Sequence, residues 1–296
     1  MIPYVRDIDV EYGRCDRVSA LIRRVTANNP GPFTYLGTGT YIVGHGEVAV
    51  IDPGPDLPEH LDAILAATVG EKVSHILVTH HHLDHSPLAR PLAKATGATI
   101  YGCAVAGPLV EDGVQVEAGY DHFVPDVSVC GGATIAGGGW TMEAIATPGH
   151  TSNHVCYALA EENALFSGDH IMGWSTTVIT PPDGDMGDYL RSLGVIQARG
   201  FDTLWPTHGP PITKVAPFID AYIAHRRERE SQILDRLAAG DSRIVEMVPR
   251  LYATVDERLW PAAARSVQAH MIELVKTGRV AADGAAGLDG TYRLAR

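Results

Sequence analysis

The sequence is poor in cysteine, and no two of its cysteines form a Cys-x-x-Cys pair. Cysteines this far apart argue against a cysteine zinc site and against a disulfide framework, so we expect buried, reduced thiols. The chain also lacks an apolar run of membrane-spanning length, and residues 1–7 lack the charged-then-apolar pattern of a signal peptide. These absences predict a soluble, cytoplasmic protein without a membrane partner. The four cysteines are Cys15, Cys103, Cys130 and Cys156.

The glycines do not form a nucleotide-binding loop, because none of them lies in a G-x-G-x-x-G or Walker arrangement. The composition is that of an ordinary globular protein, with 45% apolar and 20% charged residues. A chain of 296 residues is long enough for one large domain and one small domain.

The negative charge is concentrated in the first part of the chain. Residues 1–214 hold 11 basic and 24 acidic side chains, a balance of −13, whereas residues 215–296 hold 12 and 11, a balance of +1. An acidic surface disfavours the unaided capture of a long polyanion, although bound divalent metal ions would offset part of that charge.

The run from His80 to Ser86 contains the pattern His-x-His-x-Asp-His. In an extended segment His80 and His82 project to the same side, and Asp84 and His85 follow at once. Several imidazoles in one place repel one another when protonated, so a bound cation is the simplest reason for them. Imidazole nitrogen combined with carboxylate oxygen is a ligand set that suits zinc.

The segments around this run alternate between strand-like and helical patterns. A short apolar strand over residues 75–79 delivers the histidines, and Ser86-Pro87 predicts the start of a helix that runs to residue 95. This alternation predicts an α/β layered domain whose ligands lie on loops at one edge of a sheet. Further strands are expected at 40–43, 48–51, 98–101, 141–146, 155–159, 164–169 and 203–205, and further helices at 59–68 and 185–199.

Metal-competent side chains also follow four other predicted strands. The motifs that carry them are Asp52-Pro53-Gly54, Pro148-Gly149-His150, Ser167-Gly168-Asp169 and Thr207-His208-Gly209. Because each motif directly follows a strand-like run, we expect the side chains to meet at one edge of the domain.

Together with the histidine run, these motifs resemble the metallo-β-lactamase superfamily over residues 35–212. The resemblance implies an αββα sandwich with two metal ions at one edge, and two zinc ions are expected, with iron or manganese as alternatives. It assigns His80, His82 and His150 to the first ion and Asp84, His85 and His208 to the second, with Asp169 bridging both. It also implies that Asp52 steadies the ligand loops.

The expected reaction is hydrolysis. Two cations about 3.5–4 Å apart can share a water and lower its pKa toward neutrality, and the resulting hydroxide attacks a carbonyl or phosphoryl centre. Asp84 is placed to orient this nucleophile and to pass its proton to the leaving group. The expected substrate class is a small ester or thioester.

Residues beside the ligand motifs are candidates for contact with the substrate. His154 and His170 follow ligands closely, and we expect them either to support the ligands or to touch the substrate. Trp174, Ser175 and Thr176 come soon after Asp169 and are candidates for the pocket wall, although Trp174 also fits a core position.

The resemblance leaves several activities open. An exported zinc β-lactamase is disfavoured, because in those enzymes cysteine or serine stands where this chain has Asp169. Flavodiiron proteins replace one motif histidine with glutamate, whereas this chain keeps His82. Glyoxalase-type thioesterases share the ligand set, and a mono-iron persulfide dioxygenase remains an alternative. A binding protein without activity is disfavoured, because it would not need seven polar ligands.

The C-terminal part resembles the winged-helix end of the β-lactamase-like endoribonuclease branch. A helix is expected over 215–239, then helices at 244–252 and 261–277 and a short β wing at 278–280 and 291–294. We therefore divide the chain into a catalytic domain (1–214), a connecting helix (215–240) and a winged-helix-like α+β subdomain (241–296).

The role of this subdomain is open at this point. Cleavage of single-stranded RNA is the alternative function, with Arg265, Lys276 and Arg279 as phosphate contacts, but packing or homodimer formation fits the weak charge better. In the connecting helix, residues 225–230 alternate in charge, which predicts a solvated, salt-bridged face in preference to a phosphate site.

Overall fold

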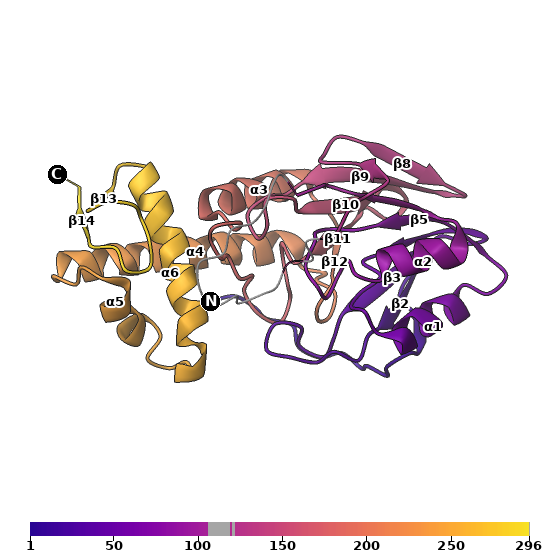
Figure 1. The fold of residues 1–296 in the computed structure, drawn as a ribbon, viewed down its shortest axis with the longest axis horizontal. Coiled ribbons are helices and arrows are strands. Elements are labelled where there is room, and N and C mark those ends of the chain that lie inside the picture. Colours follow the sequence, from indigo (N-terminus) through magenta and orange to yellow (C-terminus); the bar gives the residue numbers. More distant parts are fainter. Residues whose placement is uncertain (106–118, 120–121, 296) are drawn as a thin grey trace.

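A computed structural model describes residues 1–105, 119 and 122–295 of the chain. Two sheets lie face to face, and a smaller C-terminal lobe stands beside them (Figure 1). No helix within the described residues is long and apolar enough to cross a membrane.

The first sheet has seven strands in the order β1-β2-β3-β4-β5-β6-β7. Side chains alternate along its central strands: Tyr41 and Val43 of β3 face the second sheet, whereas Ile42 faces the helices outside. Both faces are therefore buried, which explains the nearly continuous apolar runs in these strands. The bounds are β1 Cys15–Arg17, β2 Ile22–Thr26, β3 Gly39–Val43, β4 Glu47–Ile51, β5 Lys72–Leu77, β6 Thr99–Gly102 and β7 Val127–Ser128.

The second sheet has five strands in the order β12-β11-β10-β9-β8. Along β10, Tyr157 points into the core between the sheets and Cys156 points to the opposite face. Strands β11 and β12 run parallel, so their carboxyl ends meet at one edge. The bounds are β8 Thr134–Gly137, β9 Trp140–Ala146, β10 Val155–Leu159, β11 Ala164–Gly168 and β12 Thr203–Pro206, with a 3₁₀ turn η1 at Ala160–Glu162.

Helices cover the outer face of each sheet. Helices α1 (Pro58–Ala67) and α2 (Ala89–Thr96) bury Ile64 and Leu92 against the first sheet. Helices α3 (Met186–Arg199) and α4 (Val215–Ala238) bury Leu193 and Phe218 against the second. The order helix, sheet, sheet, helix confirms the predicted αββα sandwich (Figure 1).

The helix after the histidine run begins two residues later than predicted, at Ala89 and not at Pro87. The Ser86 hydroxyl donates to the carbonyl oxygens of His81 and His82, at 3.1 and 3.2 Å, and does not cap a helix. Helix α2 begins at Ala89 because residues 82–88 form a turn that folds back onto the histidines.

Helix α4 passes through both parts of the protein. Its first half contributes Phe218 and Tyr222 to the core beneath the second sheet, and its last turns contribute Ile233 and Leu237 to a separate core in the C-terminal lobe. That lobe contains helices α5 (Ile244–Leu251) and α6 (Trp260–Lys276), the 3₁₀ turn η2 (Glu257–Leu259), and the paired strands β13 (Val280–Ala282) and β14 (Tyr292–Leu294).

Two cations of the C-terminal lobe form ion pairs within the protein. Lys276 of α6 pairs with Asp185 at the start of α3, and Arg279 pairs with Glu230 of α4. Gly187 of α3 lies so close to Glu273 of α6 that a Cβ would meet its carboxylate at 2.4 Å. The lobe thus packs directly against the catalytic domain.

The solvated face predicted for residues 225–230 is wrong in part. Arg227 and Glu228 are exposed, but Arg226 is only 3% exposed and donates to the carbonyl of Thr177 in the catalytic domain. Alternation of charge along the sequence does not respect the helical period, so one of the arginines faces inward.

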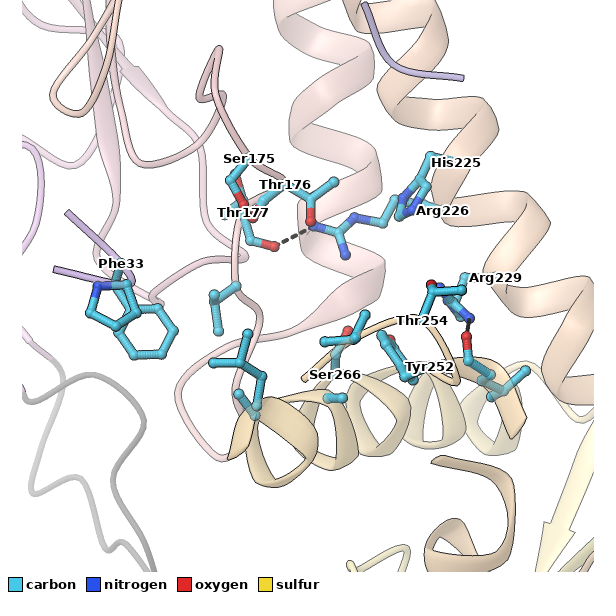
Figure 2. A pocket seen from close by; sticks show the side chains of 17 residues that line it. Phe33, Ser175, Thr176, Thr177, His225, Arg226, Arg229, Tyr252, Thr254 and Ser266 are labelled. Atoms are coloured by element: carbon cyan, nitrogen blue, oxygen red, sulfur yellow. Dashed lines mark hydrogen bonds between the residues drawn. The ribbon is translucent and has the colours of Figure 1, made fainter. Parts of the chain in front are cut away.

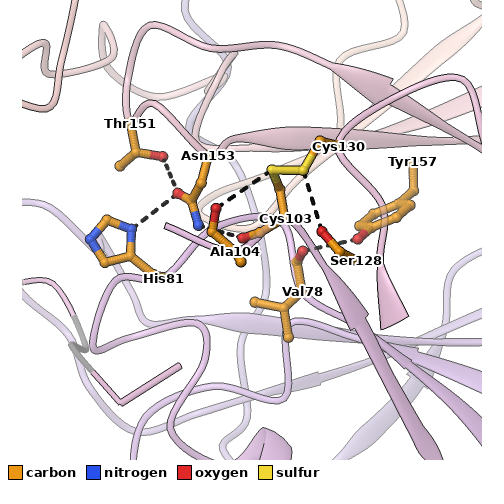
Figure 3. The surroundings of a disulfide bond; sticks show 9 residues. All are labelled: Val78, His81, Cys103, Ala104, Ser128, Cys130, Thr151, Asn153 and Tyr157. Atoms are coloured by element: carbon orange, nitrogen blue, oxygen red, sulfur yellow. Dashed lines mark hydrogen bonds between the residues drawn. A yellow bond between two sulfur atoms is a disulfide. The ribbon is translucent and has the colours of Figure 1, made fainter. Parts of the chain in front are cut away.

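The prediction of four reduced thiols is also wrong. Cys103 and Cys130 form a disulfide across 27 positions of sequence, and Cys15 is exposed, so only Cys156 is a buried free thiol (Figure 3). Residues 127–128 pair with β6, which brings the two cysteines together. Sequence spacing did not reveal this contact, because it depends on the order of the strands. A disulfide also removes cysteine usage as an argument for a cytoplasmic location.

We predict that Cys103→Ser lowers the free energy of unfolding by about 2–4 kcal/mol, because the cross-link restricts the unfolded chain. Urea denaturation under non-reducing conditions measures this change, and Cys15→Ser at an exposed free thiol is the control. Alkylation of the unreduced, denatured protein should label Cys15 and Cys156 alone in mass spectrometry. Labelling of all four cysteines would contradict the cross-link.

A second prediction concerns His270 of α6, which is 1% exposed and whose ring nitrogens lack a hydrogen-bond partner among the described residues. Burial, followed by the charges of Arg226 and Arg229, lowers the pKa of His270 to about 3. The unfolded chain therefore binds a proton that the folded chain does not, and stability falls as the pH decreases from about 6.5 toward 3.

The free energy of unfolding falls between pH 7 and pH 5, and in His270→Leu this fall should be smaller by about 2 kcal/mol. Thermal unfolding at both pH values measures the difference, with His45→Leu at an exposed site as the control. An unchanged gap between the two unfolding temperatures would show that His270 is protonated in the folded protein.

Candidate metal centre

Seven side chains from four loops meet at the edge where the two sheets come together. The run after β5 supplies His80, His82, Asp84 and His85, and the segments after β9, β11 and β12 supply the other three. Those three are His150, Asp169 and His208. The structure thus brings together all seven side chains that the sequence motifs single out.

Three of the histidines form the first group. His80 Nε2 lies 3.0 Å from His82 Nδ1, which lies 3.2 Å from His150 Nε2. Burial, and then the neighbouring histidines, lower the pKa of His80 and of His82 well below the usual value. These rings are therefore neutral at pH 7, which is the form that binds a metal ion.

Asp84, His85 and His208 form the second group. His208 Nε2 lies 3.1 Å from an Asp84 oxygen, and His85 Nε2 lies 3.6 Å from the same oxygen. Burial opposes protonation of His85, but the carboxylates of Asp84, Asp169 and Asp52 raise its pKa well above the usual value. A cation would take the place of that proton.

Asp169 lies between the two groups. One of its oxygens is 3.6 Å from His85 Nε2 and 3.9 Å from His150 Nε2, and the other is 3.5 Å from His208 Nε2. Among the described residues, His85 Nε2, His208 Nε2 and Asp169 Oδ1 are buried atoms without a hydrogen-bond partner. Buried polar atoms that converge without partners fit a bound cation, so these residues fit a metal centre.

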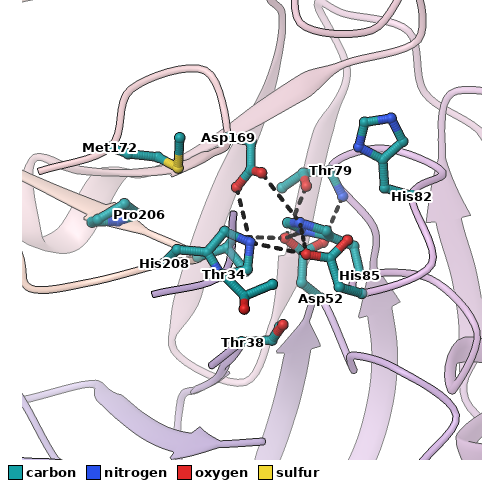
Figure 4. A network of polar contacts seen from close by, with 12 residues as sticks. Thr34, Thr38, Asp52, Thr79, His82, His85, Asp169, Met172, Pro206 and His208 are labelled. Atoms are coloured by element: carbon teal, nitrogen blue, oxygen red, sulfur yellow. Dashed lines mark hydrogen bonds and ion pairs between the residues drawn. The ribbon is translucent and has the colours of Figure 1, made fainter. Parts of the chain in front are cut away.

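Asp52 connects the loops beneath this centre (Figure 4). Its carboxylate accepts from the backbone N–H of Thr79 at 2.8 Å, and from the hydroxyls of Thr79 and Thr207 at 2.8 and 2.9 Å. It also lies 2.9 Å from His85 Nδ1, so the opposite nitrogen of that ring points into the centre. One carboxylate therefore orients a ligand and joins β5 to β12.

Other ligands are held in the same way through the nitrogen that faces outward. His150 Nδ1 lies 2.7 Å from the carbonyl of Val178, and His208 Nδ1 lies 3.2 Å from the carbonyl of Gly37. These carbonyls and the two threonines are not among the ligand candidates that the sequence motifs indicate. Thr79 and Thr207 each directly precede a metal-competent residue, and that position is the signal that could have indicated them.

His154 and His170 lie behind the centre. His154 is 1% exposed, bonds Thr147 through Nδ1 at 2.8 Å, and accepts from the backbone N–H of Asp169 at 3.2 Å. His170 is fully buried beside Tyr189, and burial lowers its pKa to about 3. His154 therefore supports the backbone of Asp169 from inside, and neither histidine has an exposed surface to offer a substrate.

The candidate pocket residues after Asp169 face different surroundings. Ser175 and Thr176 line a cavity between this loop and the C-terminal lobe (Figure 2). Trp174 is not among the residues that line it and stacks instead on Tyr35, with ring centroids 5.0 Å apart. The indole therefore packs on the N-terminal part of the chain.

We predict that Asp52→Asn weakens metal binding by about 10- to 100-fold, because the amide cannot accept from all four donors. Competition with a chromophoric chelator measures the affinity. Asp56→Asn, at an exposed position in the same turn, is the matched control. Equal affinities in the two variants would show that Asp52 does not set the geometry of His85.

Two sequence profiles match the chain. The profile of the Metallo-beta-lactamase superfamily matches residues 35–208, and that of the Beta-lactamase associated winged helix domain matches residues 244–288. The chain shares the fold of a beta-lactamase domain protein from Burkholderia ambifaria, with a TM-score of 0.79 at 18% identity over 98% of this chain and 96% of that one.

Curated relatives agree with these profiles. The Beta-lactamase-like protein 2 homolog of Caenorhabditis elegans is 33% identical over 90% of this chain and 88% of its own length. A protein of Aspergillus fumigatus named Atrochrysone carboxyl ACP thioesterase is 32% identical over 95% of this chain and 79% of its own length. With the winged-helix match, these findings confirm that the chain belongs to the metallo-β-lactamase superfamily.

Proposed function

We propose that this protein is a dinuclear zinc hydrolase that cleaves a small ester or thioester. The observation that carries the proposal is the convergence of seven buried or half-buried nitrogen and carboxylate ligands, three of whose atoms have no hydrogen-bond partner among the described residues. Imidazole and carboxylate ligands at such a site favour zinc over magnesium or calcium.

The ligands divide into two sets with one shared member. His80, His82 and His150 would hold one ion, and Asp84, His85 and His208 would hold the other. Asp169 would bridge them, because its two oxygens lie within 3.9 Å of nitrogens from both sets. When bound, two such ions supply Lewis acidity and lower the pKa of a shared water.

Asp84 is the candidate for proton transfer. Its side chain is 26% exposed, whereas the side chains of His85, His208 and Asp169 that surround it are at most 2% exposed. The ionised form dominates because His85 and His208 hold the pKa of this carboxyl well below its usual range, against the effect of burial. Because it is the more exposed carboxylate of the centre, Asp84 would be placed to take up a proton on the open side and to pass it to the leaving group.

The thioester preference rests on the relatives that are named thioesterases. The structure adds that Lys276 and Arg279, two of the cations expected to contact RNA, pair with carboxylates of the protein. Packing of the C-terminal lobe accounts for these cations without a nucleic acid. RNA cleavage and iron-dependent persulfide oxidation are the alternatives that the experiment must separate.

A substrate panel combined with metal analysis tests the proposal. The zinc-loaded protein should hydrolyse thioesters faster than phosphodiesters or single-stranded RNA, and it should consume no oxygen with a persulfide. Elemental mass spectrometry should find two zinc ions per chain. Turnover that requires iron and oxygen, or that is confined to RNA, would reject this function.

We predict that Asp169→Ala lowers the zinc content from two ions toward one and reduces kcat on thioesters by at least about 100-fold, because this carboxylate belongs to both sites. Asp56→Ala, at an exposed carboxylate, is the control. Circular dichroism checks that the variant is folded. Two tightly bound zinc ions and normal turnover in Asp169→Ala would refute the bridging role.

A further inference from the structure

A cavity of about 370 Å³ lies between the catalytic domain and the C-terminal lobe (Figure 2). Its walls come from four parts of the chain: residues 32–33, the loop 175–178, helix α4, and the region from the end of α5 to the middle of α6. Neither domain could form it alone, and its volume suits a small organic molecule.

A buried arginine reaches into this cavity from α4. Arg226 is 3% exposed, and its Nη2 donates to the carbonyl of Thr177 while its Nε has no hydrogen-bond partner among the described residues. The guanidinium carbon lies 5.1 Å from the centroid of the Tyr189 ring. Within the described part of the chain Arg226 forms no ion pair, so a buried charge is left without a counterion.

Two further basic side chains line the same wall. Arg229 lies 4.2 Å above the Tyr252 ring and donates to the carbonyl of Leu251 at 3.0 Å. Burial, and then the charges of Arg226 and Arg229, lower the pKa of His225 to about 4. The described lining residues include no carboxylate, so the cavity has a positive potential that nothing in its wall neutralises.

Apolar side chains also line the cavity, and the loop that carries one of them is bonded to the metal centre. Val178, Val255 and Leu259 line the cavity. The carbonyl of Val178 is the partner of His150 Nδ1, and the hydroxyl of Thr177 donates to the carbonyl of Asp169 at 2.9 Å. The loop that forms the cavity wall is thus bonded to two of the seven residues of the centre.

We propose that this cavity is a substrate subsite in which Arg226 binds an oxyanion, a carboxylate or phosphate, carried by the substrate. The inference rests on the proposed function. The apolar side chains take the aliphatic part of the ligand, and its scissile carbonyl then extends past Val178 toward the metal centre. A guanidinium donates two parallel hydrogen bonds to such an anion, and the aromatic rings beneath the arginines hold them in place.

Three thioesters test this subsite and distinguish the two sources of the anion. Butyryl-N-acetylcysteamine is neutral, glutaryl-N-acetylcysteamine carries a carboxylate on the acyl side, and butyryl-phosphopantetheine carries a phosphate on the thiol side. The zinc-loaded protein should show a kcat/KM about 10- to 100-fold higher for one of the anionic substrates than for the neutral one, the range of a charged hydrogen bond.

Arg226→Gln should remove that advantage, measured as the ratio of kcat/KM for the anionic and the neutral thioester in the same variant, because the neutral thioester has no anion for Arg226 to bind. Arg226→Lys should restore part of it. Arg227→Gln, an exposed neighbour on the same helix, is the matched control and should behave as the unsubstituted protein. Equal preference for the three thioesters, unaffected by either substitution, would overturn the proposal.

A second variant tests the subsite without replacing Arg226, so that the test does not depend on the folding of Arg226→Gln. Ser266→Asp places a carboxylate in the cavity from α6 and keeps the arginine, so it should abolish the preference by competing with the ligand. A folded Ser266→Asp protein that retains the full preference would also overturn the proposal.

Binding without turnover separates this inference from the proposed function. Isothermal titration of the zinc-loaded protein with glutarate and with inorganic phosphate should show weaker binding in Arg226→Gln than in Arg227→Gln, since anions on the metal ions affect both equally. If thioesters are not hydrolysed but this difference is found, the function is wrong and the anion site stands. If thioesters are hydrolysed and the two variants bind both anions equally, the anion site is wrong and the function stands.

Discussion

The carboxylate of Asp52 is the contact on which the rest of the site depends. It accepts from Thr79 after β5 and from Thr207 after β12, strands that belong to different sheets, and it fixes the ring of His85. Each of these donors is buried, so loss of the carboxylate would leave several polar groups without partners in the interior. The two sheets pack through apolar side chains, and at this edge the Asp52 carboxylate adds charged hydrogen bonds to the hydroxyl contacts that Tyr41 and Tyr157 make between the sheets.

Helix α4 has a comparable role on the other side of the molecule. Phe218 and Tyr222 anchor its first half beneath the second sheet, and Ile233 and Leu237 anchor its end in the core of the C-terminal lobe. A continuous helix with a buried stripe in each core holds the lobe against the catalytic domain. Arg226 lies between the two anchors, at the level where the lobe faces the loop 175–178. The cavity is therefore a consequence of how the two cores are joined.

The motifs of the sequence were sufficient for the fold and for the grouping of side chains at the centre, because each ligand follows an apolar strand and the ends of such strands meet. The motifs could not predict contacts that depend on how the elements pack together. Ser86 has the residue type of a helix cap, yet it bonds the backbone of the histidine run. Cys103 and Cys130 are neighbours only because β7 pairs with β6. Arg226 alternates with acidic residues in sequence but faces inward on the helix.

Net charge is a poor guide to what this protein attracts. Residues 1–214 carry −13, yet the described walls of the cavity between the catalytic domain and the C-terminal lobe hold two arginines and no acidic side chain. A surface charge acts through water and is screened within about 8–10 Å by salt, whereas a buried guanidinium acts on a ligand directly. An acidic exterior repels long polyanions from the surface, and a small anion that enters the cavity meets the opposite potential. Under the proposed function, the two charge distributions together favour a compact anionic substrate over a polymer.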